Sequence, residues 1–206
     1  MKTNPTLAVA AILTGIALSG ARAEITGSAH DFSNETWAQN QICLPCHTPH
    51  GANTTVADSP LWNHKLSTAT YTMYGSATMN AVPGTPDGRS KLCLSCHDGT
   101  VALDSFGANT GTQFIGASDS AYIGSDLRND HPVSITYNTA LATADGELHN
   151  PSLRTTALGG TIAADMLFNG KLECASCHDV HNAQNNEGLL LVDNAGSALC
   201  LTCHDK

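Results

Sequence analysis

The feature that most constrains this chain is a five-residue pattern, C-x-x-C-H, which occurs four times and contains all eight cysteines. C-x-x-C-H is the attachment sequence of a c-type haem: the two thiols bond covalently to the porphyrin, and the histidine is the proximal ligand of the iron. The sequence therefore predicts four covalent haems. The cysteines are Cys43, Cys46, Cys93, Cys96, Cys174, Cys177, Cys200 and Cys203, and the proximal histidines are His47, His97, His178 and His204.

Two other uses of cysteine were weighed against haem attachment. A disulfide framework explains an even number of cysteines in a secreted protein, but it does not explain a histidine directly after every pair. Zinc sites also use C-x-x-C pairs, with histidine ligands usually placed elsewhere. Four complete motifs out of four favour haem.

The first 23 residues have the pattern of a secretory signal peptide. Lys2 supplies a positive start, Leu7 to Leu18 form a short apolar run, and Ala21-Arg22-Ala23 fits a cleavage site. The alternative is an N-terminal membrane anchor, for which the apolar run is short. We expect the mature chain to start at residue 24, to contain no membrane span and to be secreted, either to the extracellular space or cell surface or to the periplasm.

Composition limits both the partners and the core. The net charge of −9 makes nucleic acid an unfavourable partner, although the acidity can also serve solubility alone. Aromatic residues make up only 5% of the chain, so a core of polypeptide side chains would be weak. We therefore predict one tetrahaem domain over residues 24–206 with a core formed by haems. Its fold class would be multihaem cytochrome c: mostly irregular, with short α-helices at the motifs and little β structure.

Local patterns predict a few short elements between the motifs. Ser33 or Asn34 is a plausible N-cap for a short helix that runs to residue 42. Extended stretches are expected at 71–74 and 134–137, another short helix at 163–168, and a loop over 104–129.

The flanks of the motifs alternate, which predicts two haem-pair repeats around residues 43–98 and 174–205. Motifs one and three carry a further histidine three residues later, His50 and His181. Motifs two and four share a serine and a leucine before the first cysteine and an aspartate after the histidine. Independent drift toward similar flanks is the alternative.

Four irons have eight axial positions, and the motifs fill only four. Histidine at the second position closes the iron and lowers its potential, whereas methionine raises it. Six further histidines are present, so we predict two histidines at each iron and regard Met73, Met79 and Met166 as packing residues. In order of preference, the candidate distal ligands are His50, His181, His131, His64 and His30, with His149 last. The acids Asp98, Asp179 and Asp205, each directly after a proximal histidine, are expected to form turns or to be exposed.

Several segments together resemble the secreted tetrahaem c-type cytochromes of metal-reducing bacteria, and most closely the filament-forming extracellular ones. The resemblance covers most of the mature chain. It is carried by residues 43–51, 61–64 (Leu-Trp-Asn-His), 92–99, 130–133 (Asp-His-Pro-Val) and 174–182.

This resemblance implies an electron carrier rather than an enzyme, with two histidines at each iron. It implies polymerisation with other copies of the chain into an extracellular filament that conducts electrons to external acceptors. In such filaments a histidine of one subunit can bind the haem iron of its neighbour, and His30 is our candidate. The partners would be redox cytochromes and an extracellular metal or oxide.

Two other functions stay open from the sequence. One is a monomeric periplasmic electron shuttle. The other is a multihaem reductase of a small oxyanion, which needs an open iron position; a C-x-x-C-K motif would favour it, and the sequence contains none.

Overall fold

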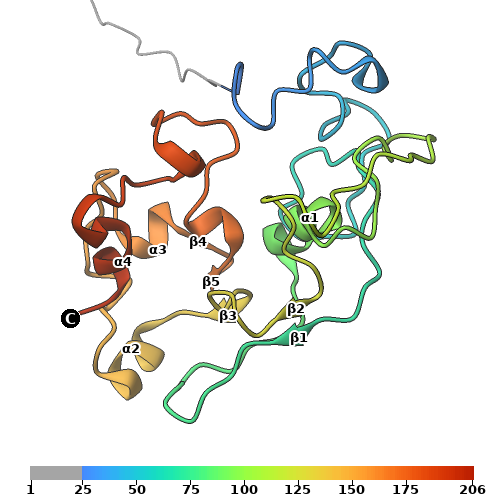
Figure 1. Cartoon of the computed structure of the whole chain (residues 1–206). Coiled ribbons are helices and arrows are strands. Elements are labelled where there is room, and N and C mark those ends of the chain that lie inside the picture. The colour runs from blue at the N-terminus through green and yellow to red at the C-terminus, as the bar shows by residue number, and fades with distance from the viewer. Residues whose placement is uncertain (1–24) are drawn as a thin grey trace, which may run out of the picture.

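The computed structural model describes residues 25–206, which form an irregular chain with short helices and strands (Figure 1). The predicted signal peptide, residues 1–23, lies outside the described residues. Loops and turns predominate, and the two small sheets have two and three strands. The mostly irregular fold with little β structure is thereby confirmed. Within residues 25–206, no helix combines the length and apolar character needed to cross a bilayer.

The four motifs adopt helical geometry to different extents. The second motif ends α1 (Gly88–His97), and the fourth lies largely in α4 (Ala198–Cys203). The third begins in the 3-10 turn η2 (Cys174–Ser176). The first forms only a turn, in which the His47 N–H donates to the Cys43 carbonyl at 2.8 Å. The prediction of a short α-helix at each motif is therefore right for the second and fourth motifs, while the other two form only single turns.

The remaining helices are also short: α2 (Thr139–Asp145), α3 (Ile162–Asp165), and the 3-10 turns η1 (Thr36–Ala38), η3 (Glu187–Leu189) and η4 (Ala195–Ser197). The helix expected up to residue 42 is reduced to η1, because Gln39 and Asn40 have φ of 56° and 55°, which a right-handed helix cannot continue. The helix expected at 163–168 is shortened to α3, and a strand follows it directly.

Five two-residue strands form the sheets. β1 (Thr72–Met73) pairs in parallel with β2 (Asp126–Leu127). β3 (Ile135–Thr136), β4 (Leu167–Phe168) and β5 (Lys171–Leu172) form an antiparallel sheet in the order β3-β5-β4. The extended stretches expected at 71–74 and 134–137 are confirmed. β2 lies in a region that we expected to be loop throughout.

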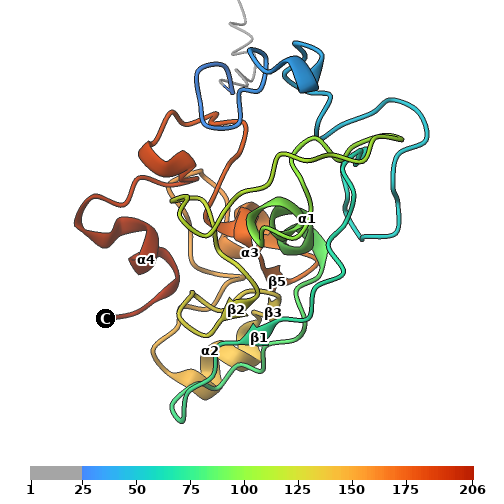
Figure 2. The ribbon, with the colours of Figure 1, turned by 45° about the vertical axis from the view of Figure 1, so that its right-hand side comes forward.

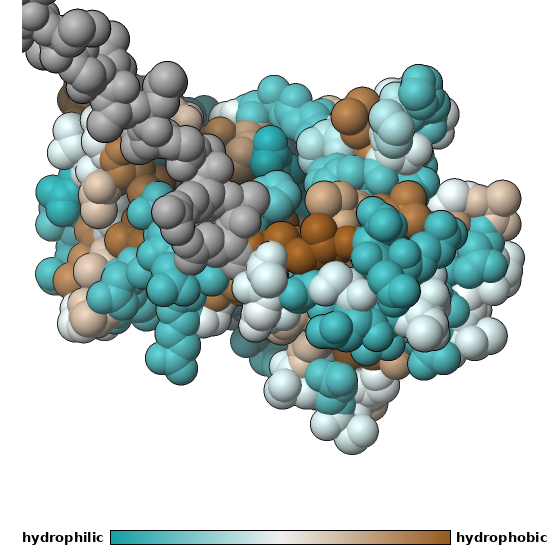
Figure 3. Space-filling view, turned by 90° about the horizontal axis from the view of Figure 1, so that it is seen from above, coloured by the Kyte–Doolittle hydropathy of each residue, from teal (hydrophilic) through white to brown (hydrophobic). Residues whose placement is uncertain are grey.

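Apolar side chains gather in two separate clusters. The larger belongs to the C-terminal half and centres on the three-stranded sheet and α3: Ile135, Tyr137, Ala142, Ile162, Met166, Leu167, Leu172, Val192 and Leu199. The smaller contains Val56, Trp62 and Leu92. Other large apolar side chains reach the surface, where Figure 3 shows them in patches among hydrophilic residues.

The two halves of the chain meet where α1 packs against η2, near the middle of the molecule (Figures 1 and 2). This contact brings the second and third motifs side by side. The first motif belongs to the N-terminal half and the fourth to the C-terminal half.

Truncation of Ile162 tests whether the larger cluster stabilises the protein. Its side chain is fully buried, so Ile162→Ala is expected to lower the free energy of unfolding by about 2–5 kcal/mol in a denaturant titration. The matched control is Leu153→Ala at a side chain that is 75% exposed, with an expected change within about 0.5 kcal/mol. Equal effects of the two variants would contradict a core at this position.

Candidate haem sites

Three of the four motif histidines are oriented by a main-chain carbonyl. In each, the ring Nδ1 donates a hydrogen bond to an oxygen well downstream in the sequence. The pairs are His47 with Pro60 at 2.5 Å, His97 with Ala121 at 2.7 Å and His178 with Gly188 at 3.0 Å. Because a carbonyl only accepts, Nδ1 carries a proton, and in the neutral ring the lone pair is then on Nε2. This is the tautomer that binds a metal through Nε2.

Sites one and three share the same local structure around this hydrogen bond. The carbonyl that accepts from the histidine is followed in both by a leucine with positive φ, Leu61 at 52° and Leu189 at 56°. That conformation is rare for leucine, and it turns the chain back toward the motif. Two further main-chain bonds are equivalent: Thr48 to Leu61 and Asn63 to Cys46 in site one, and Asp179 to Leu189 and Leu191 to Cys177 in site three.

Three motif histidines each lie close to a second histidine. The distances between ring centres are 6.1 Å for His47 and His181, 6.0 Å for His97 and His30, and 6.3 Å for His204 and His131. Two imidazoles that bind one metal ion, each with a bond of about 2 Å as for zinc, have ring centres about 6 Å apart. The spacing of all three pairs therefore fits an iron between two histidines.

His30 has the surroundings of a neutral imidazole. Burial, followed by repulsion from His97 and two other nearby imidazoles, lowers its pKa to about 4. Its Nδ1 is buried and has no hydrogen-bond partner within residues 25–206. A histidine must be neutral to bind a metal, so His30 would bind without first losing a proton.

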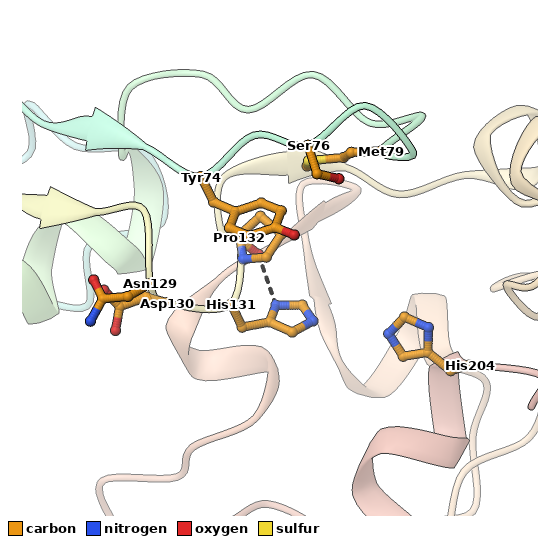
Figure 4. Close-up of a pocket in the computed structure, with 8 residues that line it drawn as sticks. All are labelled: Tyr74, Ser76, Met79, Asn129, Asp130, His131, Pro132 and His204. Atoms are coloured by element: carbon orange, nitrogen blue, oxygen red, sulfur yellow. Dashed lines mark hydrogen bonds between the residues drawn. The ribbon is translucent and has the colours of Figure 1, made fainter.

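A cavity of about 420 Å³ lies beside His131 and His204 (Figure 4). The two rings project into it from the loop before β3 and from the end of α4. His131 Nδ1 donates to the Pro132 carbonyl at 3.0 Å, which leaves Nε2 free. A cavity of this size is typical of a site for a small molecule or cofactor. Tyr74 and Met79 line the opposite wall.

The structure does not pair the remaining candidates in this way. His64 is only 3% exposed, and its two ring nitrogens lie 2.9 Å and 2.8 Å from the carbonyls of Ala102 and Lys65. His50 is exposed. Within residues 25–206, no second histidine ring faces His178 at the spacing of the other three pairs. The distal roles of all five candidates stay predictions.

Two of the acids that follow proximal histidines have defined structural roles. Asp98 is only 2% exposed and accepts hydrogen bonds from three side-chain hydroxyls, one of them that of Tyr71 at 2.6 Å. The expectation of an exposed charge is therefore wrong for Asp98, although it also forms a turn with Thr100. Asp179 accepts from the main chain of His181 at 3.0 Å, and so supports the turn that carries this candidate ligand.

The eight cysteines are all unpaired thiols in the described residues. Burial raises the pKa of Cys46 and Cys177 to about 11 and that of Cys96 and Cys203 to about 12, so these thiols are neutral at ordinary pH. Haem attachment converts such thiols into uncharged thioethers, and therefore suits their buried position.

Removal of a facing histidine tests the pairs. His181→Ala and His131→Ala are each expected to convert one haem of the holoprotein from six-coordinate low-spin to high-spin iron, because an axial ligand is lost. Electron paramagnetic resonance of the oxidised protein measures this change. The control is His149→Ala, at a ring that lies 4.0 Å from the Asp205 carboxylate. Fully low-spin spectra in both test variants would rule out these two ligands.

Comparison with known proteins bears on the C-terminal part of the chain. Residues 167–206, which contain the third and fourth motifs, match the doubled CXXCH motif family. No curated protein matches the chain. The family match and the four motifs together indicate a multihaem c-type cytochrome that binds its haems covalently.

Proposed function

We propose that this protein is an electron-transfer cytochrome with four c-type haems and histidine at both axial positions of each iron. The observation that carries the proposal is the set of three histidine pairs at 6.0–6.3 Å. An iron between the two rings of such a pair would have both axial positions filled and none open to a substrate. An iron of this kind accepts and donates electrons without binding a reactant.

The chain's own residues provide the conditions for such transfer. Each pair of cysteines would hold a porphyrin in place, and the carbonyls of Pro60, Ala121 and Gly188 fix the rotation of three motif histidine rings. When bound, the haem iron supplies the ferric–ferrous couple. Because the ligands are held by main-chain hydrogen bonds, they need little rearrangement when the charge on the iron changes.

The filament is the finer part of the proposal, and it rests on the resemblance to the filament-forming extracellular cytochrome OmcE. His178 lacks a facing histidine within residues 25–206, so His50 or a histidine of a neighbouring copy would complete that site. Our candidate for a histidine that binds the haem iron of a neighbouring subunit remains His30. Its ring centre here lies 6.0 Å from that of His97 in its own chain. An exchange of N-terminal segments between copies would keep this pair and change only the subunit that supplies His30.

Two rival functions make different demands on the same site. A monomeric shuttle needs all eight axial ligands within one chain, including a second ligand for the iron that His178 would bind. An oxyanion reductase needs one open iron, and His178 marks where it would be. A high-spin ferric signal in the wild-type holoprotein would favour the reductase.

The test of the proposal is to purify the secreted protein and determine its haem content, spin state and assembly. We expect four haems per chain, reversible reduction with low-spin iron, and ordered filaments in electron cryomicroscopy. Monodisperse particles at high concentration would contradict the filament and favour the shuttle. Absence of covalent haem from the intact chain would contradict electron transfer itself.

A further inference from the structure

The junction between the two halves of the chain brings two haem motifs into direct contact. α1, which contains Cys93, packs against η2, which begins at Cys174. The Cys174 thiol is close enough to raise the pKa of Cys93. These are the first cysteines of the second and third motifs, and each would carry one edge of a porphyrin. A contact between these two haems would therefore be one route for electrons from one half to the other, beside the haem between His47 and His181.

One buried carboxylate joins the segments on both sides of this junction. Glu173 directly precedes the third motif and is only 2% exposed. Its Oε2 accepts from the hydroxyl and the main-chain N–H of Ser90 in α1, and from the Ser134 hydroxyl at 3.0 Å just before β3. In return, the Ser90 hydroxyl accepts from the Cys174 N–H at 3.0 Å. A single side chain thus connects three segments that are distant in sequence.

The surrounding contacts reinforce this connection. Glu173 also forms a capping box with Ser176, which fixes it to the start of the third motif. On the α1 side, Gly88 leaves room for the carboxylate, because a Cβ at this position would lie 3.2 Å from Oε1. An ion pair between Lys171 and Asp87 links the same two segments at the rim.

Connecting two segments through a buried carboxylate costs free energy, because the charged form loses its hydration. Burial raises the pKa of Glu173, and the hydrogen bonds from Ser90 and Ser134 only oppose that effect. Apolar packing would hold two segments together without this desolvation cost, but it would fix their relative position less strictly. Directional hydrogen bonds define geometry, and an error of 1 Å between reacting centres can greatly slow a reaction.

We propose that Glu173 is the positioning residue that sets the separation and orientation of the haems attached at Cys93 and Cys174, and so sets the rate of electron transfer between these two haems. This proposal rests on the proposed electron-transfer function. The role is indirect, because Glu173 acts on the motif backbones and through them on the porphyrins. Ser90 and Ser134 supply the matching donors.

The experiment compares Glu173→Ala and Glu173→Gln with Glu35→Ala, a change at an exposed carboxylate, in the oxidised holoprotein. Circular dichroism in the main haem absorption band reports neighbouring porphyrins as a paired positive and negative signal. We expect Glu173→Ala to retain four haems but to lose a large part of this signal. Glu173→Gln is expected to recover most of it, because the amide oxygen still accepts from the serines. Glu35→Ala is expected to match the wild type.

If Glu173→Ala does not fold or does not take up four haems, Ser134→Ala replaces it. This change removes one donor to Oε2 and leaves the contact with Ser90, so a smaller loss of the paired signal is expected. An unchanged signal in whichever variant carries four haems would overturn the proposal, as would equal losses in the Gln and Ala variants. Either result would leave the proposed function intact, whereas a wild-type protein without covalent haem would refute that function instead.

Discussion

A hydrogen bond from a motif histidine to a main-chain carbonyl recurs at three of the four motifs. In each case a segment downstream of the motif supplies the carbonyl. The acceptor lies 10, 13 or 24 residues from the histidine: Pro60 and Ala121 are in loops, and Gly188 is in η3 with φ and ψ that are not helical. A loop can bring a carbonyl to any orientation, whereas helices and strands use theirs internally. The low content of regular structure is therefore consistent with a chain built around metal ligands, and the positive φ of Leu61 and Leu189 is accepted because it aims the preceding carbonyl.

The polypeptide alone supplies only a modest apolar core. The two apolar clusters are small, and large apolar side chains such as Val82 and Leu153 are 86% and 75% exposed. Porphyrins attached at the four motifs would add large apolar bodies to a core that the polypeptide provides only in part.

The chemistry was easier to predict from the sequence than the geometry. C-x-x-C-H encodes covalent attachment and one iron ligand in adjacent residues, so the attachment sites needed no fold. The position of His181 after the third motif made it a candidate distal ligand, but its neighbour His47 lies in the other predicted haem-pair repeat, a contact that the repeat pattern did not indicate. By contrast, the acceptors Pro60, Ala121 and Gly188 act through main-chain oxygens, which leave no residue-type signal. Glu173 looked like an ordinary acid, because only the fold brings Ser90 and Ser134 to it.

Each of the three histidine pairs joins segments that are far apart in the chain, and this bears on how the protein matures. His47 and His181 are separated by more than half of the sequence, and His131 and His204 come together only when the last residues are in place. An iron between such histidines closes a long loop, at an entropic cost that rises only slowly with loop length. The haem at the first motif would therefore keep one axial position open until the second half of the chain had been made. The haem sites would then be completed in an order different from the order of their motifs in the sequence.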